Sequence, residues 1–179
     1  MRLKCFARPS SHNKGGGYNQ SMDSPFFPVR LRARYAETDQ MGVVHHAVYP
    51  VWFETARTEL ARAVGLPYRA WEEQGVLLMV SELNCRYRSP ARYDDEITVL
   101  VRVSEVASRG ATFSYRVEAS DGTLLAQGTT RHLAVSRATG RPVVLPETLR
   151  AVLRSNPQRC SETASLPELR PTRARTRSG

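Results

Sequence analysis

A single long amphipathic stretch interrupts a chain that is otherwise patterned as short β-strands, and this order restricts the fold more than any other feature. Apolar residues recur there at helical spacing, at Val48, Val51, Trp52, Ala56, Leu60, Ala63 and Val64. Pro50 falls in the first turn, where its missing N–H costs nothing. Gly65 followed by Pro67 ends the pattern. The sequence therefore predicts one helix over about 48–64, and a shorter helical piece over 68–73.

Alternating apolar and polar residues predict one strand before this helix and four after it. In the first strand, arginines alternate with Val29, Leu31, Ala33 and Tyr35. In the second, one face is expected to hold Leu77, Met79, Leu83, Cys85 and Tyr87. The turn signals Arg109-Gly110 and Asp121-Gly122 predict consecutive antiparallel neighbours. The helix and the sheet each have one face to bury, so the fold class is α+β, with the helix laid against a five-stranded antiparallel sheet.

The length of 179 residues suits one domain. We expect residues 28–146 to form this domain. Residues 1–27, rich in Ser, Gly, Asn and Pro, are expected to be a flexible extension in which Met22 offers an alternative translation start. Residues 147–179 are expected to be a basic, disordered tail, apart from a short helical turn as far as Leu153.

The net charge of +9 raises the question of a nucleic-acid partner. Residues 28–145 hold 15 arginines against 13 acidic residues, so the excess of positive charge lies mostly in the ends. Those ends lack the interleaved aromatic residues of a single-strand binding groove. We therefore expect no nucleic-acid partner for the domain, while nucleic-acid binding by the Arg-rich tail stays open as a property that could coexist with another function. No apolar run is long enough to span a bilayer, and three cysteines without metal-ligand spacing indicate a reducing, cytoplasmic environment.

The loop before the helix concentrates the groups that can do chemistry. Asp39, Gly42, His45 and His46 lie within eight residues and directly precede the helix. A helix N-terminus offers unpaired N–H groups that can polarise a carbonyl. Asp39 can act as a nucleophile or as a general base, and either histidine can orient substrate or move a proton. A turn or capping role for the aspartate is the alternative. No metal is expected, because the side chains of adjacent histidines diverge and no further ligand is suitably spaced.

Two stretches of the sequence resemble a known family. Tyr35-x-Glu-Thr-Asp39-x-x-Gly42-Val43-Val44-x-His46-x-x-Tyr49-x-x-Trp-Phe-Glu54-x-x-Arg57 resembles the signature of the 4-hydroxybenzoyl-CoA thioesterase family of hotdog proteins. It is most similar to the branch of short-chain acyl-CoA thioesterases associated with the bacterial Tol–Pal system. Tyr87-x-x-Pro90-Ala91-x-x-Asp94-Asp95 and Arg109-Gly110 also match, so the resemblance covers roughly residues 28–145.

The resemblance implies a hotdog fold, in which the sheet wraps around the helix and two subunits join their sheets edge to edge. The expected assembly is a homodimer or homotetramer with active sites at the interface. The implied reaction is hydrolysis of acyl-CoA without a cofactor, with backbone N–H groups near the helix start polarising the thioester carbonyl. The implied catalytic residues are Asp39, His46 and Tyr35. The implied substrate-binding residues are Gly42, Val43, Arg88, Arg92 and Arg109.

Two other functions remain open at this point. One is hydration or dehydration of an acyl thioester, although that chemistry needs a paired Asp and His on a differently placed helix. The other is a non-catalytic acyl-CoA-binding module, against which the intact set of Tyr35, Asp39 and His46 argues. The sequence leaves open whether the acyl group is aliphatic or aromatic and whether it is carried by CoA or by acyl carrier protein. It also leaves open whether Asp39 attacks directly or activates water.

Overall fold

The computed structural model describes residues 25–65 and 67–155. Its elements, in chain order, are β1 (Phe27–Arg32), the single 3₁₀ turn η1 (Tyr35–Glu37), α1 (Val48–Ala63), α2 (Tyr68–Glu73), β2 (Val76–Tyr87), β3 (Glu96–Ala107), β4 (Gly110–Ala119), β5 (Leu124–Ser136) and α3 (Glu147–Arg154). Helix α3 buries Leu149 and Leu153, so packed structure continues beyond the domain end expected at residue 146. At the other end, β1 already begins at Phe27, the last residue of the expected extension, whereas residues 1–24 and 156–179 lie outside the described residues.

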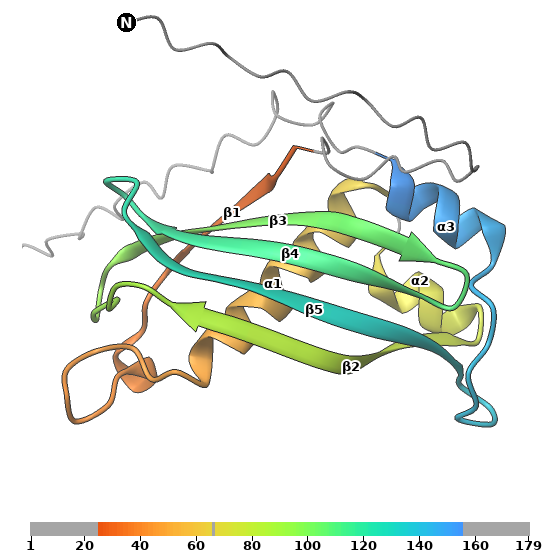
Figure 1. Cartoon of the computed structure of the whole chain (residues 1–179), viewed down its shortest axis with the longest axis horizontal. Helices are drawn as coiled ribbons and strands as arrows, with labels where there is room; N and C mark the ends of the chain where they lie inside the picture. Colours follow the sequence, from red (N-terminus) through yellow and green to blue (C-terminus); the bar gives the residue numbers. More distant parts are fainter. Residues whose placement is uncertain (1–24, 66, 156–179) are drawn as a thin grey trace, which may run out of the picture.

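The five strands form one antiparallel sheet in the order β1-β3-β4-β5-β2, which curves around α1 (Figure 1). The two pairs joined by tight turns, β3–β4 and β4–β5, are antiparallel neighbours as predicted. The prediction is wrong for β2 and β3. Strand β2 pairs with β5 at one edge, and β3 pairs with β1. The connection after β2 is not a tight turn, so it is free to carry the chain across to the other half of the sheet.

Helix α1 packs its apolar face onto the sheet through Tyr49, Trp52, Phe53, Ala56 and Leu60. The Phe53 ring stacks on the Tyr115 ring, with centroids 4.3 Å apart. Gly128 in β5 permits this close approach, since a Cβ there would lie 2.7 Å from the Phe53 ring and 2.4 Å from the Asn84 carbonyl oxygen. Val51, which we expected on the buried face, is instead half exposed.

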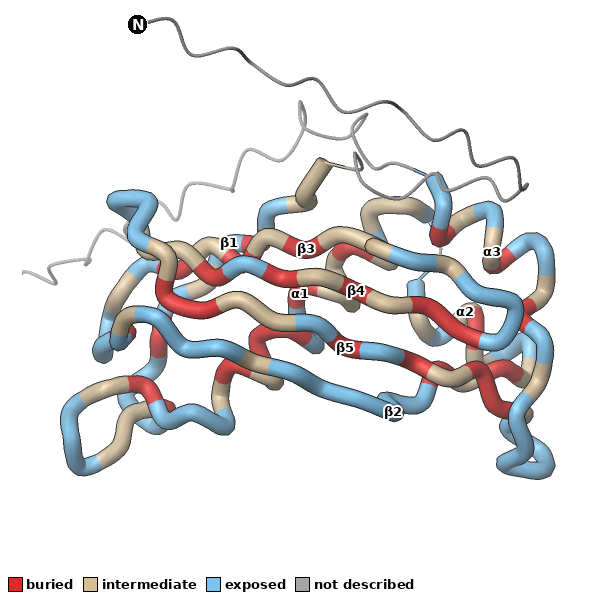
Figure 2. Tube along the Cα trace, viewed as in Figure 1, coloured by how far each residue is buried: buried red, intermediate tan, exposed pale blue. Residues whose placement is uncertain are grey.

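The second strand shows where alternation misleads. Val76 and Leu78 are buried, whereas Met79 is half exposed, so the expected face is wrong in the first half of β2. A register shift between Val80 and Glu82 adds one residue and reverses which positions face the helix. Beyond the shift Cys85 packs partly against the core, as the alternation predicts. Figure 2 shows β2 as a mostly exposed edge.

Candidate active site

Residues 38–46, the Asp39 loop, form a closed turn that is anchored to the rest of the protein. The backbone N–H of Asp39 donates to the Val43 carbonyl at 2.9 Å, and that of Gly42 donates to the Asp39 carbonyl at 2.9 Å. Gly42 has a φ of +71°, a conformation that favours glycine. The Val44 N–H donates to the carbonyl of Ala91, at 2.8 Å, in the loop between β2 and β3. The two loops are therefore held side by side.

Of the two Asp39 carboxylate oxygens, one is hydrogen-bonded within this turn. Its Oδ1 accepts a hydrogen bond from the Met41 N–H at 2.8 Å, which is the turn role anticipated as the alternative. Within the described residues its Oδ2 accepts no hydrogen bond. The side chain borders an open hollow of about 310 Å³ between the two loops. The same hollow is lined by Met41, Val43, Val44, His46, Tyr49, Tyr87, Arg88, Ser89 and Pro90.

The start of α1 lies across this hollow. The Val48 N–H donates to the His45 carbonyl at 2.9 Å, and the Ala47 N–H donates to His45 Nδ1 at 3.2 Å. His45 therefore accepts one hydrogen bond through its ring and one through its carbonyl just before the helix, a role that the sequence pattern did not distinguish from that of His46. The His46 N–H has no hydrogen-bond acceptor among the described residues. It is a donor available to a ligand at the helix N-terminus.

Tyr87, at the end of β2, fixes the backbone at this point. Its hydroxyl donates to the His46 carbonyl at 2.9 Å, and its ring meets the buried Tyr49 ring edge-on at 5.1 Å. Partial burial raises the pKa of Tyr87 to about 12, so the hydroxyl keeps its proton at neutral pH. Burial likewise raises the pKa of Tyr49. The sequence assigned Tyr87 no role in the site, because the spacing of residues along the chain does not indicate that its hydroxyl reaches the His46 carbonyl.

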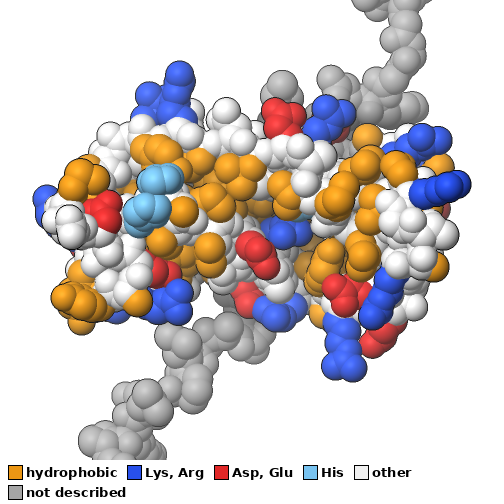
Figure 3. Space-filling model, turned by 90° about the horizontal axis from the view of Figure 1, so that it is seen from below, with side chains coloured by type: hydrophobic (Ala, Val, Ile, Leu, Met, Phe, Trp, Pro, Cys, Tyr) orange, Lys and Arg blue, Asp and Glu red, His pale blue; other side chains and the backbone are white. Residues whose placement is uncertain are grey.

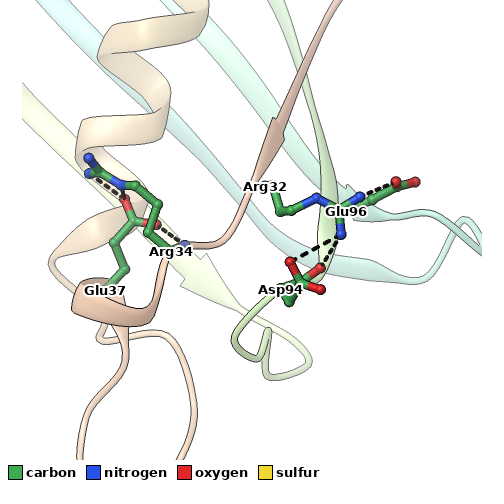
Figure 4. A network of polar contacts seen from close by, with 5 residues as sticks. All are labelled: Arg32, Arg34, Glu37, Asp94 and Glu96. Atoms are coloured by element: carbon green, nitrogen blue, oxygen red, sulfur yellow. Dashed lines mark hydrogen bonds and ion pairs between the residues drawn. The ribbon is translucent and has the colours of Figure 1, made fainter. Parts of the chain in front are cut away.

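Polar contacts brace the segment that leads into the loop (Figure 4). Glu37 is buried, and its Oε1 accepts from Arg34 Nη2 at 2.8 Å while its Oε2 accepts from the Arg34 N–H at 2.8 Å. Burial pushes the pKa of Glu37 upward, but the hydrogen bonds from Arg34 outweigh it and hold the pKa below its ordinary value. The Glu37 carbonyl accepts the His45 N–H at 2.9 Å. Nearby, Arg32 pairs with Asp94 and Glu96, which ties β1 to β3.

The other expected site residues lie at different distances from this hollow. Arg88 lines the hollow, and Arg92 Nη1 lies 3.5 Å from the Gly42 carbonyl oxygen. Tyr35 does not line the hollow. Its ring is 77% exposed and meets the Tyr93 ring edge-on at 5.5 Å, because β1 ends at Arg32 and η1 turns the side chain outward.

Arg109 lies at the β3–β4 turn, at the opposite end of the sheet from the Asp39 loop (Figure 1). A single chain therefore does not bring it to the hollow. Between residues 25 and 155, Leu66 excepted, no group of three or more His, Cys, Asp or Glu side chains is placed to hold a metal ion. None of the helices in this part of the chain is long and apolar enough to cross a membrane.

This arrangement of sheet, helix and loop is shared with known proteins, and a family model matches residues 33–153. The chain belongs to the thioesterase-like superfamily. The expected α+β hotdog fold and the family-level resemblance are thereby confirmed.

Named relatives match most of the chain. The acyl-CoA thioesterase YbgC of Haemophilus influenzae is 36% identical over 73% of this chain and 95% of its own length. The acyl-CoA thioester hydrolase YbgC of Escherichia coli O157:H7 is 28% identical over 72% of this chain and 96% of its own.

Solved structures agree with these matches. A hypothetical protein of Thermus thermophilus is 45% identical, with a TM-score of 0.67 over 70% of this chain and 95% of that one. A DHNA-CoA thioesterase of Staphylococcus aureus is 29% identical, with a TM-score of 0.67 over 70% of this chain and 85% of that one.

Proposed function

We propose that this protein hydrolyses acyl-CoA thioesters to the free acid and CoA, with Asp39 and the N-terminus of α1 as the reactive groups. The carrying observation is that Asp39 and His46 line one open hollow, and that among the described residues one Asp39 carboxylate oxygen and the His46 N–H have no hydrogen-bond partner. The names of the bacterial relatives support the reaction and the substrate class. The side chains of His46 and Arg88 extend the same surface, where they would contact the substrate.

The chemistry needs few groups, because a thioester carbonyl is already electrophilic and a thiolate leaves readily. The His46 N–H would donate a hydrogen bond to the carbonyl oxygen and stabilise the negative charge that develops on it. Asp39 has two routes. It either attacks the carbonyl carbon to form a mixed anhydride that water then hydrolyses, or takes a proton from the water that attacks. Both routes expel CoA as its thiolate and leave the acyl group as a carboxylate.

We further propose that the protein works as a homodimer or a homotetramer joined at the β2 edge. Strand β2 pairs with β5 on one side only, which leaves a row of backbone groups open to a second copy. Large apolar side chains are exposed along it, at Met79, Val80, Leu83 and Tyr87. Figure 3 shows hydrophobic side chains gathered on this side of the molecule. A second copy would cover them and close over the neighbouring hollow. Light scattering should give at least twice the chain mass, and an active monomer at micromolar concentration would contradict this assembly.

The activity is tested by incubating the full chain with a panel of acyl-CoA thioesters and measuring free thiol with a thiol reagent. The panel includes short and long straight acyl groups, aromatic acyl groups and one acyl-carrier-protein thioester. Release of thiol from at least one of them is the expected result. An enoyl-CoA in the panel, followed by its own absorbance, detects a hydratase instead. Loss of enoyl absorbance without thiol release would contradict the proposal, as would inertness of the whole panel.

A further inference from the structure

Arg57 borders two separate hollows on the surface of α1. The first is a groove of about 150 Å³ between α1 and β2, lined among others by Val51, Leu83 and His132. The second is an apolar pocket nearer the C-terminal end of α1, lined among others by Leu60, Val64, Trp71, Leu78 and Phe113. In the described part of the chain, Arg57 is the one residue that lines both. Arg57 belongs to the sequence signature but does not line the hollow that contains Asp39.

The contacts of Arg57 make it the partition between these hollows. Its guanidinium carbon lies 5.9 Å from the centroid of the Phe113 ring, a cation–π distance. The Phe113 ring in turn meets the His132 ring edge-on at 5.2 Å. Within residues 25–65 and 67–155 no salt bridge joins Arg57 to a carboxylate. The partition is thus one cationic side chain resting on an aromatic wall.

The groove lies beside the hollow that contains Asp39. On α1 the adjacent residues Tyr49 and Pro50 line the hollow and the groove respectively. On β2, Tyr87 lines the hollow, and Leu83, four residues earlier, lines the groove. A thioester whose carbonyl lies at the start of α1 would direct its acyl group into this groove. This step rests on the function proposed above.

The character of the groove changes along its length. Val51, Val80 and Leu83 give it an apolar wall, Glu54 adds a carboxylate on the α1 side, and the part formed by β4 and β5 is polar. There the Tyr115 hydroxyl and the Thr130 hydroxyl are 2.9 Å apart, and Thr130 Oγ1 lies 2.9 Å from His132 Nε2. Burial lowers the pKa of His132 to about 4, so this polar end carries a neutral imidazole beside the Arg57 charge. An alkyl chain gains by lying along the apolar part, but it would desolvate a cation if it continued.

We propose that Arg57 sets the maximum length of the acyl group by closing the groove against the apolar pocket beyond it. Arg57 follows Val48 by nine residues, which is roughly 14 Å along a helix. Since three chain bonds span roughly 3.5 Å, this distance corresponds to about twelve bonds, so straight acyl groups of up to about twelve carbons fit before Arg57. Longer ones need the pocket. Removing the guanidinium joins the two hollows and admits them.

The test compares kcat/KM for octanoyl-CoA and hexadecanoyl-CoA in the wild-type chain, Arg57→Ala and Arg57→Met. The wild type should prefer octanoyl-CoA at least tenfold. Both variants should raise the relative kcat/KM for hexadecanoyl-CoA at least tenfold, since each additional buried methylene is worth roughly fourfold. Arg57→Met keeps most of the stem length, so it decides the result if Arg57→Ala does not fold. Arg62→Ala, an exposed arginine on the same helix paired with Glu59, is the matched control and should leave the length preference unchanged.

A second readout follows the pocket itself. Trp71 is buried in its wall, so a long chain that enters should change Trp71 fluorescence, a signal assigned with a Trp71→Phe variant. Hexadecanoyl-CoA should change it in Arg57→Ala and not in the wild type. The inference is overturned if folded Arg57 variants keep the wild-type length preference, or if the wild type already accepts hexadecanoyl-CoA as well as octanoyl-CoA. If the wild type hydrolyses no acyl-CoA, the proposed function fails. The fluorescence comparison then tests by itself whether Arg57 separates the two hollows. If hexadecanoyl-CoA produces no change of Trp71 fluorescence in Arg57→Ala, the inference is overturned.

Discussion

The two ends of α1 are held in place by different interactions. At its N-terminus the Asp39 loop is fixed by backbone hydrogen bonds and by the hydrogen bond from the Ala47 N–H to the His45 ring, and Asp39 and His46 line an open hollow. Further along, Phe53, Ala56 and Leu60 are at most 5% exposed and pack on the sheet. Hydrogen bonds such as those of the Asp39 loop orient reactive groups but each contributes little to stability. Burial of apolar side chains, as in the packed part of α1, contributes most of the stability. Substitutions at the first end should therefore change rate, and substitutions at the second should change stability.

The sharpest test of this division is Asp39→Asn. The amide retains the oxygen that accepts the Met41 N–H but removes the charge that attacks or takes a proton. We expect kcat to fall on the order of 10²–10⁴-fold, the range for losing a positioned acid–base group. Thermal melting should show little change. Asp121→Asn is the matched control, because Asp121 accepts the Thr123 N–H at 2.8 Å in a similar turn at the β4–β5 connection. Near wild-type activity in folded Asp39→Asn would refute the proposed mechanism.

Gly128→Ala tests the packed end. The new Cβ would lie 2.4 Å from the Asn84 carbonyl oxygen and 2.7 Å from the Phe53 ring, so strand or helix must shift. We expect the free energy of unfolding to fall by about 1–3 kcal/mol, as for other overpacked cores. Denaturant titration measures it, and Thr129→Ala, an exposed neighbour on the same strand, should stay within about 0.5 kcal/mol. A Gly128→Ala variant that kept full stability but lost activity would contradict the division between a loop end that governs rate and a packed end that governs stability.

Tyr87→Phe lies between the two kinds of change. It deletes the hydroxyl that donates to the His46 carbonyl but keeps the ring against Tyr49. We expect kcat to fall roughly tenfold with about 1 kcal/mol of stability lost, the usual worth of one hydrogen bond. With its pKa raised to about 12, Tyr87 should contribute no ionisation to a pH–rate profile between pH 6 and 9. Tyr93→Phe, which alters an exposed tyrosine outside the hollow, is the control. An unchanged kcat would show that the clamp on His46 is dispensable.

Tyr35→Phe should have the smallest effect of the four. The resemblance implies a catalytic role, but the ring is largely exposed and packs on Tyr93 rather than toward the hollow. We expect less than a twofold change in kcat, roughly 0.4 kcal/mol of activation free energy, in steady-state assays on the best substrate. A tenfold loss would mean that this hydroxyl reaches substrate only in the assembled oligomer.

The sequence by itself determined most of the elements and the position of the Asp39 loop directly before α1. Helical spacing predicted α1 to within a residue, and the Gly-Pro stop separated it from α2. Tight-turn residues predicted the pairing of β3 with β4 and of β4 with β5. These signals are local, since each depends on residues a few positions apart, and local sterics and hydrogen bonding act directly on them.

The tertiary structure alone decided which distant groups meet. It placed β2 beside β5, and the register shift in β2 turned Leu78 rather than Met79 into the core. It brought the Tyr87 hydroxyl to the His46 carbonyl and set Arg57 between two hollows. None of these contacts has a local signature. The contacts between distant groups depend on where the long loops return the chain. The facing of side chains along β2 depends on a one-residue register shift, which reverses the side chains on either side of it.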